Sequence, residues 1–101
     1  MTTDTAVKSR NVVATIVKEP SKFKVVVCND DVTPMEFVIL MLMTIFRHSE
    51  ESATDLTLKI HNDGQAIAGV YSFEIAEQKG IDATFLAREH GHPLQIRVEE
   101  E

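Results

Sequence analysis

The chain has 101 residues, 44% of them hydrophobic, and a formal net charge of −6. This length predicts one small domain with a single core. The only cysteine, Cys28, excludes an intramolecular disulfide and a zinc site built from several cysteines, and it favours a reducing compartment. The negative charge argues against nucleic acid as a partner, because a duplex binder needs a basic face.

The first residues lack a basic stretch followed by an apolar core, and no apolar run approaches the ~20 residues that a membrane span needs. We therefore expect a cytoplasmic protein with no membrane partner. Residues 1–22 are rich in Thr, Ser and Lys and end after Pro20-Ser21, which predicts a flexible N-terminal arm. The arm carries a balance of +2, so residues 23–101, the predicted domain, carry −8. The short apolar run Val12-Val13-Ala14 and Ile16-Val17 is a candidate for a transient strand or a partner-binding segment, and we expect it to be disordered when no partner is present.

The first predicted strand covers residues 23–28, where Phe23, Val25 and Val27 alternate with Lys24, Val26 and Cys28. A polar turn, Asn29-Asp30-Asp31, follows it.

The helix after this turn has several start signals. Thr33 is a candidate N-cap, Glu36 completes a capping box, and Pro34 then falls at the first helical position. Val32 and Phe37 have the spacing of a hydrophobic staple. The helix is expected to end at about Arg47.

Almost every residue from 37 to 46 is apolar, which predicts a helix that is buried on most sides or borders an apolar pocket. Met35 lies at its edge and suits a pocket that accepts different shapes, although simple core filling is the default explanation for methionines.

Ser49 predicts the cap of a second helix, which Asn62-Asp63-Gly64 ends. Thr57, Ile60 and His61 cluster on this helix because they are spaced by about one turn.

Residues 65–71 predict a second strand, with Gly69 marking a close backbone approach. Ser72 predicts the cap of a third helix that stops at Gly91, and Gly80 in its middle weakens it by ~1 kcal/mol relative to alanine. A last strand runs from Leu94. The order predicts an α+β fold, a two-layer β-α-α-β-α-β domain with a three-stranded, mainly antiparallel sheet and helices packed on one face.

No set of residues with catalytic spacing is present, so we expect a protein that is not an enzyme and has no cofactor. Asp30 and Asp31 as a general acid/base pair, and His90 with His92 as metal ligands, are the weaker alternatives to turn and helix-end roles. We expect no metal site.

Recognition of a small cationic group fits the residues better. An α-amino group carries several N–H donors and a charge, so its site needs converging acceptors and preferably a carboxylate. Asn29 and Asp30 supply such acceptors, as does His61 when its ring is neutral. Beside them an apolar hollow would receive a side chain, giving a two-part site; it is bounded by Met35, Val38, Ile60 and Leu94.

The run from Asn29 to Val38 resembles the signature of the ClpS family, the adaptors that carry N-end-rule substrates to a Clp AAA+ unfoldase of the ClpA type and its protease. The resemblance covers nearly the whole chain after Phe23 and extends through Gly64, residues 66–70, 74–77 and 87–89, and His92-Pro93-Leu94. It implies the fold predicted above. It also implies that the partners are N-degron peptides and proteins that begin with Phe, Tyr, Leu or Trp, and that the protein is a monomer.

The resemblance also implies roles for single residues. The α-amino readers would be Asn29, Asp30 and His61. The rim and lining of the hydrophobic pocket would be Asp31, Thr33, Met35, Val38, Ile60 and Leu94. Thr57 stands where the family has its usual pocket-gating methionine, and Gly80 where a helix former is usual. Glu74 and Lys79 match positions that face the unfoldase, although solvated surface charges explain them equally well. The arm matches a flexible extension that the unfoldase engages.

A second hypothesis shares the same element order. A ribosomal-stalk-type C-terminal interaction domain also has the order β-α-α-β-α-β but binds translation factors. The pair Asn29-Asp30 favours the adaptor.

Overall fold

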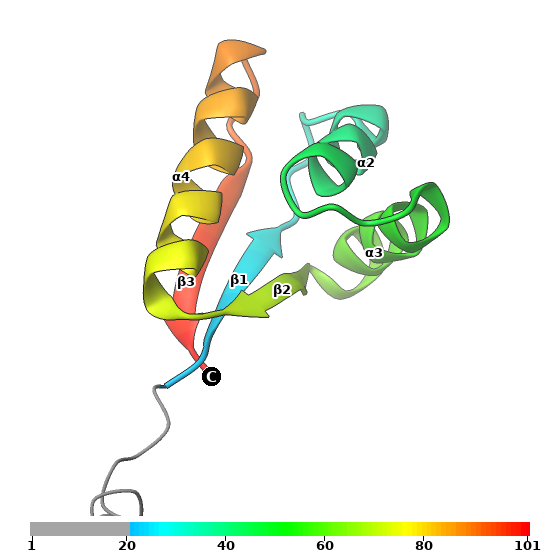
Figure 1. Cartoon of the computed structure of the whole chain (residues 1–101). Helices are drawn as coiled ribbons and strands as arrows, with labels where there is room; N and C mark the ends of the chain where they lie inside the picture. Colours follow the sequence, from blue (N-terminus) through cyan, green and yellow to red (C-terminus); the bar gives the residue numbers. More distant parts are fainter. Residues whose placement is uncertain (1–20) are drawn as a thin grey trace, which may run out of the picture.

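The computed structural model describes residues 21–101. The predicted arm therefore lies outside the described residues, apart from its last two positions. The elements follow the predicted order (Figure 1): β1 Phe23–Cys28, α2 Met35–Thr44, α3 Glu50–Asp63, β2 Gln65–Tyr71, α4 Phe73–Glu89 and β3 Gln95–Glu100. The α+β class and the β-α-α-β-α-β order are confirmed.

The three strands form one sheet in the order β2-β1-β3, with β1 antiparallel to both neighbours. The register between β1 and β3 is uninterrupted from Phe23 opposite Glu100 to Cys28 opposite Gln95. Between β1 and β2 the register shifts once, because Val25 pairs with Gly69 and Val26 pairs with Ile67. β1 is therefore the central strand. The turn that begins at Asn29 follows its last residue, so it lies at one end of the sheet, between the two outer strands.

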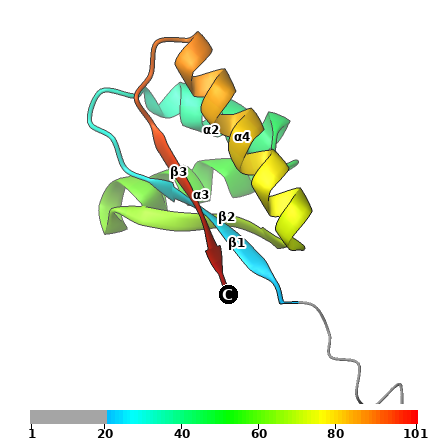
Figure 2. The ribbon, with the colours of Figure 1, turned by 90° about the vertical axis from the view of Figure 1, so that its left-hand side faces the viewer.

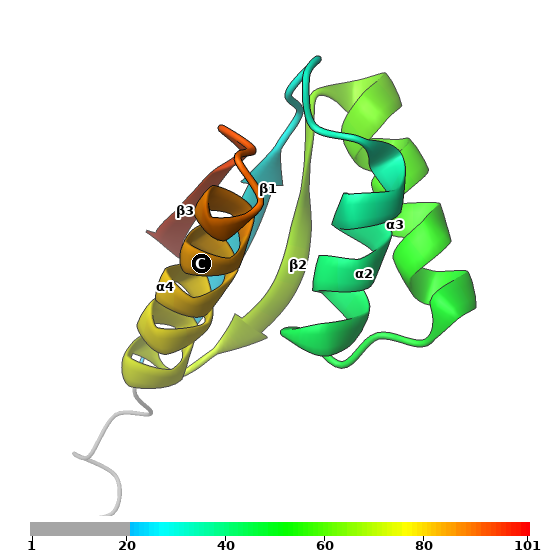
Figure 3. The same ribbon diagram turned by 90° about the horizontal axis from the view of Figure 1, so that it is seen from above.

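The helices form the second layer. α4 lies along one face of the sheet, and the α2–α3 pair lies at its β2 side (Figures 2 and 3). α4 packs closely because the side chains that it turns to the sheet are small: Ala76, Gly80, Ala83 and Ala87 are buried. A Cβ atom on Gly80 would lie 3.1 Å from the Val98 Cγ2 atom. Gly80 thus serves close helix–sheet packing within a continuous helix.

Four residues of α2 are buried in the core, namely Phe37, Val38, Met41 and Leu42. Leu40 and Met43 are 51% and 37% exposed, so the helix is not buried on most sides. The other predicted alternative holds, because Met35 and Val38 of this helix border a pocket. Within residues 21–101, no helix has the length and apolar character needed to cross a membrane.

The start of α2 differs from the prediction. The N-cap is Pro34, whose carbonyl accepts from the Phe37 and Val38 amides, and no side chain caps the helix. Thr33 is therefore not the N-cap, and the capping box with Glu36 does not form. The Thr33 hydroxyl donates to the Asp30 carboxylate instead. Val32 is 72% exposed, so the predicted staple contributes little burial.

The end of α2 also comes earlier than predicted. The helix stops at Thr44, three residues before Arg47, which has a left-handed backbone with φ 63°. The His48 amide donates to the Leu42 carbonyl at 3.1 Å. This bond closes the turn toward α3.

The other helix ends agree more closely with the sequence. The Ser49 side chain accepts from the Ser52 amide at 3.1 Å, which confirms the predicted cap of α3. Gly64 ends α3 in the left-handed region at φ 94°. Ser72 is the N-cap of α4, but its side chain makes no capping bond. Gly91, at φ 75°, follows the end of α4 as predicted.

Candidate functional site

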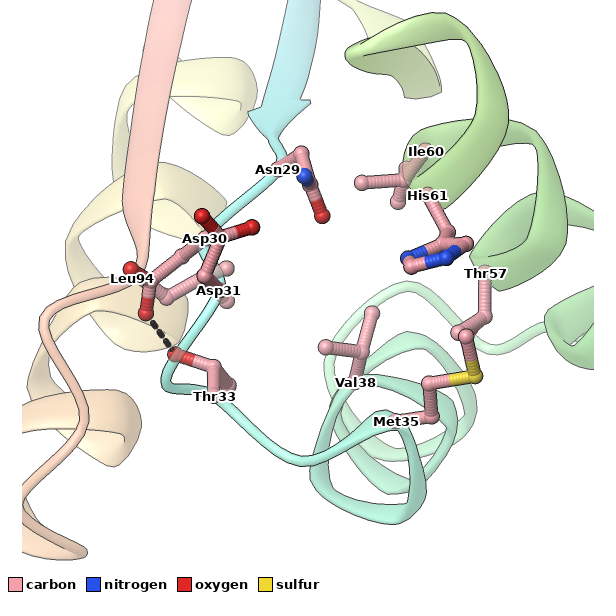
Figure 4. Close-up of a pocket in the computed structure, with 10 residues that line it drawn as sticks. All are labelled: Asn29, Asp30, Asp31, Thr33, Met35, Val38, Thr57, Ile60, His61 and Leu94. Carbon is pink, nitrogen blue, oxygen red and sulfur yellow. Dashed lines mark hydrogen bonds between the residues drawn. The ribbon is translucent and has the colours of Figure 1, made fainter.

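A pocket opens where the ends of β1 and β3 meet α2 and α3 (Figure 4). It has a volume of about 190 Å³. A cavity of roughly 150 Å³ can hold benzene, so this pocket has the size for one aromatic side chain. Ten residues line it: Asn29, Asp30, Asp31, Thr33, Met35, Val38, Thr57, Ile60, His61 and Leu94. The structure thus brings together all the residues predicted to read the α-amino group and to form the pocket.

The polar wall begins at the residue after β1. The backbone N–H of Asn29 donates to the carbonyl of Gly64 at 2.8 Å, which ties the end of β1 to the end of α3. Gly64 is suited to this place because its φ of 94° strains any residue with a Cβ atom. The Asn29 side chain and the His61 ring both point into the pocket, from opposite sides (Figure 4).

Asp30 is held by its neighbour in the turn. The Thr33 hydroxyl donates to the Asp30 Oδ2 atom, and the Thr33 amide donates to the Asp30 carbonyl at 3.4 Å. Thr33 is buried and Asp30 is partly exposed, so this hydrogen bond is partly shielded from water, and it holds the carboxylate at the pocket. Sequence reasoning missed this role because Thr33 also has the spacing of an N-cap.

The apolar wall comes from the helices and from the residue before β3. Val38, Ile60 and Leu94 are 5%, 4% and 1% exposed and belong to the core. Met35 is 39% exposed and lies at the rim. Its thioether is directed toward Thr57 (Figure 4). The fixed part of this wall is thus aliphatic, and its adjustable part is a methionine.

Thr57 presents no unused hydroxyl to the pocket. Its Oγ1 atom donates to the Ala53 carbonyl at 2.8 Å, one turn earlier on α3. The residue is 3% exposed. Because the hydroxyl is already paired within the helix, Thr57 acts here as a short side chain and not as a polar one.

Leu94 is positioned by a residue that the sequence analysis did not identify. The Arg88 Nη1 atom donates to the Leu94 carbonyl at 2.7 Å and to the His92 carbonyl at 2.9 Å. These bonds fix the turn that leads into β3. Arg88 lies in the last turn of α4, where a basic residue is ordinary, so its place in the resembling stretch 87–89 did not indicate this role.

The charge of the pocket is negative. Asp30 and Asp31 contribute two carboxylates, and the ten lining residues include no lysine or arginine. Asparagine, aspartate and neutral histidine are hydrogen-bond acceptors, and the rest of the lining is largely apolar. The pocket can therefore hold a group that is cationic at one end and apolar at the other.

The two predicted unfoldase contacts lie on α4, outside this pocket. Glu74 is exposed in the first turn. Lys79 is only partly exposed, because its ammonium donates to the Ile45 carbonyl at 2.8 Å and lies 5.6 Å from the centre of the Tyr71 ring. Burial raises the pKa of Tyr71, so this ring stays neutral at physiological pH. Lys79 thus joins α4 to the end of α2.

The two histidines near the end of α4 pack against an aromatic ring. The rings of His90 and His92 lie 5.4 and 4.7 Å from the ring of Phe37. Within residues 21–101, no group of three or more His, Cys, Asp or Glu side chains is arranged to hold a metal ion.

The chain is similar to a known family of proteins. Residues 18–97 match the family model described as ATP-dependent Clp protease adaptor protein ClpS. The chain is 43% identical over 86 residues to the ATP-dependent Clp protease adapter protein ClpS of Helicobacter hepaticus, covering 85% of this chain and 87% of that protein. It is 46% identical over 84 residues to the ClpS of Hyphomonas neptunium, covering 83% and 71%.

A solved structure supports the same class. Agrobacterium tumefaciens ClpS2, bound to L-phenylalaninamide, matches with a TM-score of 0.80 and 40% identity, over 82% of this chain and 100% of that one. The chain belongs to the ClpS family of Clp protease adaptor proteins. This result decides between the two hypotheses from the sequence in favour of the adaptor.

Proposed function

We propose that this protein binds the free α-amino group and the bulky hydrophobic first side chain of N-end-rule substrates and delivers them to a Clp AAA+ unfoldase of the ClpA type. The observation that carries the proposal is the pocket itself, which joins an acceptor-rich wall to an apolar wall in a space sized for one aromatic side chain. The ClpS2 relative was solved with L-phenylalaninamide, a molecule with a free α-amino group and a phenyl ring.

The polar wall would read the amino group. An ammonium has three N–H donors, and Asn29, Asp30 and His61 offer acceptors to them. Asp30 supplies the charge, and the Thr33 hydroxyl on its other side holds it in place. A charge-assisted hydrogen bond is roughly twice as strong as a neutral one, so Asp30 would contribute most.

The apolar wall would select the first side chain. Val38, Ile60 and Leu94 form its fixed surface, with Met35 and Thr57 at one side and Asp31 and Thr33 at the rim. A large flat ring gains the most contact here. Peptides that begin with Phe, Tyr, Leu or Trp are the proposed ligands.

Delivery would use other parts of the chain. Glu74 and Lys79 on α4 are the proposed unfoldase contacts, and residues 1–22 are the segment that the unfoldase would engage. The protein would act in the cytoplasm as a monomer, without a cofactor and without chemistry of its own.

A degradation assay tests this function. Two model substrates that differ only in their first residue, Phe or Gly, are incubated with the unfoldase, its protease and ATP. Adding the protein should accelerate degradation of the Phe substrate alone. Equal acceleration of both substrates, or of neither, would contradict the proposal.

Deleting residues 1–20 separates binding from delivery. The described domain contains the whole pocket, so peptide affinity should stay within about twofold, while degradation of the Phe substrate should stop. Full degradation without these residues would refute the division of labour between arm and pocket.

A further inference from the structure

Arg97 on β3 makes hydrogen bonds that join the three strands of the sheet. Its Nη1 atom donates to the Cys28 Sγ atom on β1 at 2.8 Å, and its Nη2 atom donates to the Gln65 Oε1 atom on β2 at 3.2 Å. Its Nε atom donates to the Glu99 carboxylate on its own strand at 2.8 Å. Arginine can hold three partners at once because its planar guanidinium carries five N–H donors in a fixed geometry.

The guanidinium of Arg97 lies on the face of the sheet opposite α4. Side chains alternate between the two faces of a strand. Val98 faces α4, because a Cβ atom on Gly80 would lie 3.1 Å from its Cγ2 atom. Its neighbours Arg97 and Glu99 therefore point to the other face, where the Arg97 side chain is 41% exposed. Arg97 is thus outside the core, and it is not among the ten residues that line the pocket.

The two residues that Arg97 bridges form the last pair of the ladder between β1 and β2. β1 ends at Cys28, β2 begins at Gln65, and the two lie opposite each other. The next residues outward are Asn29 and Gly64, which are joined by the hydrogen bond from the Asn29 amide to the Gly64 carbonyl at 2.8 Å. Arg97 therefore holds the pair directly beside the hydrogen bond that ties the polar wall of the pocket to the end of α3.

This backbone hydrogen bond connects two acceptors of the pocket. The side chain of Asn29 and the ring of His61 face each other from opposite sides of the pocket (Figure 4). Gly64 ends α3, and its amide donates to the Ile60 carbonyl at 2.9 Å. A displacement of Gly64 away from Asn29 would therefore move the end of the helix that carries His61.

The end of a strand ladder opens more easily than its middle, because fewer hydrogen bonds hold it. We propose that Arg97 is a positioning residue for the α-amino site. By holding Cys28 to Gln65 across the sheet, its guanidinium keeps Asn29 and His61 at the separation that one ammonium group requires. The inference rests on the proposed function, because it assigns the α-amino group to this pair of acceptors.

Two simpler roles of Arg97 predict other results. An exposed ion pair with Glu99 contributes little to stability and has no effect on the pocket. A purely electrostatic role predicts a change of the opposite sign. Removing this positive charge makes residues 23–101 more negative, which would strengthen the binding of a cationic amino group. A positioning role predicts weaker binding instead.

Arg97→Met in the full-length chain tests the proposal, because it keeps an unbranched side chain and removes every donor. Affinity for a peptide that begins with Phe should fall about three- to tenfold. The ratio of affinities for free and acetylated N-termini should fall by the same factor, whereas the ratio for Phe and Leu peptides should stay unchanged. A lower folding stability alone would move neither ratio.

Two further variants are matched controls. Arg97→Lys keeps the charge but replaces the planar fork with a single ammonium, so it should not restore the affinity lost in Arg97→Met. Glu99→Gln removes the ion pair and leaves the hydrogen bonds to Cys28 and Gln65 in place. Its affinity for the Phe peptide should stay within about twofold of the wild-type value.

Hydrogen exchange without peptide gives a readout that does not depend on the proposed function. The Asn29 amide should exchange about tenfold faster in Arg97→Met, because the adjacent pair of residues is no longer held together. The amide of Val26, a buried residue in the middle of β1, should exchange at its wild-type rate.

Three results would overturn the positioning role of Arg97. They are an affinity in Arg97→Met that equals or exceeds that of the wild type, full affinity in Arg97→Lys, and unchanged exchange of the Asn29 amide. The wild-type protein separates this failure from a failure of the proposed function. If the wild type does not distinguish free from acetylated peptides, both are wrong; if it does and Arg97→Met does so equally well, only the role of Arg97 is wrong.

Discussion

The two walls of the pocket are held in different ways. The polar wall lies in a turn whose positions are fixed by hydrogen bonds, from the Asn29 amide to the Gly64 carbonyl and from the Thr33 hydroxyl to the Asp30 carboxylate. The apolar wall is held by packing, and its rim residue Met35 is 39% exposed.

This difference separates two properties of binding. A fixed polar wall suits a group that is the same in every substrate, such as the α-amino group. An adjustable apolar wall suits a group that varies among substrates. Changes in the polar wall should therefore weaken all ligands together, whereas changes in the apolar wall should alter their ranking.

Asp30→Ala should have the largest effect. A hydrogen bond to a charged group contributes roughly 1.5–3 kcal/mol, so affinity should fall about ten- to a hundredfold for every first residue. Fluorescence anisotropy with labelled peptides that begin with Phe and Leu measures both losses. Unchanged affinity, or a loss confined to one peptide, would contradict the role of the polar wall.

The short side chain of Thr57 should make Phe or Tyr bind about tenfold better than Leu. Leucine leaves part of the pocket unfilled and loses ~1–2 kcal/mol of contact at ~0.8 kcal/mol per methylene-sized group. Thr57→Met should raise the affinity for Leu. Thr57→Val, which keeps the shape and removes only a hydroxyl bonded to Ala53, should keep the ranking.

The comparison of peptides with different first residues has a second possible outcome. Extra room beside Thr57 would admit Ile or Val, whose branched Cβ a bulkier gate would reject. Affinities for peptides that differ only in Phe, Tyr, Leu, Ile or Val at the first position decide between the two. If Leu binds as tightly as Phe, the argument from Thr57 is wrong.

Thr33→Val should have a smaller effect that is uniform across peptides. The substitution keeps the shape of a buried side chain but frees the Asp30 carboxylate. Ordering a side chain on binding costs about 0.5–1.5 kcal/mol, so affinity should fall about two- to tenfold for Phe and Leu alike. Calorimetric titration of both peptides checks this, and a change in their ratio would place Thr33 in the apolar wall instead.

Lys79→Met should leave peptide affinity within twofold while lowering stability. The ammonium loses its hydrogen bond to the Ile45 carbonyl and its position over Tyr71, which together contribute about 1–2 kcal/mol of unfolding free energy. Urea denaturation measures this loss, with Lys59→Met on exposed α3 surface as the control. No loss of stability would show that the Lys79 contact is dispensable.

This prediction also affects how delivery is tested. Because Lys79 has a structural contact, a delivery defect in Lys79→Met has two explanations. Glu74 is exposed in the first turn of α4, so Glu74→Ala is the sharper probe of the proposed unfoldase interface.

The sequence predicted the element order because each element carries local signals. Ser49 begins α3 by accepting a hydrogen bond from the Ser52 amide, and Gly64 ends it with a left-handed backbone. Both residues act as predicted. The start of α2 was placed one residue too early, because a threonine at cap spacing can hydrogen-bond either to a helix amide or to a neighbouring carboxylate. In this structure the Thr33 hydroxyl donates to the Asp30 carboxylate.

Contacts between distant residues were harder to predict. The hydrogen bonds of Lys79 to Ile45 and of Arg88 to Leu94 depend on how helices and strands meet, and neither lysine nor arginine on a helix signals such a partner. Seven of the ten pocket residues were proposed from their chemistry and also matched the family, and the resemblance alone added Asp31, Thr33 and Thr57. A family resemblance carries information about tertiary neighbours that periodicity lacks. Their chemical roles remain predictions.

The most direct measurement compares two peptides that begin with Phe and differ only in a free or an acetylated N-terminus. Acetylation removes the charge and two of the donors that Asn29, Asp30 and His61 are proposed to bind. Titration of the wild-type protein should show binding of the acetylated peptide that is weaker by about a hundredfold or more, equivalent to roughly 2.7 kcal/mol. Affinities that agree within threefold would contradict the claim that this pocket reads a free α-amino group.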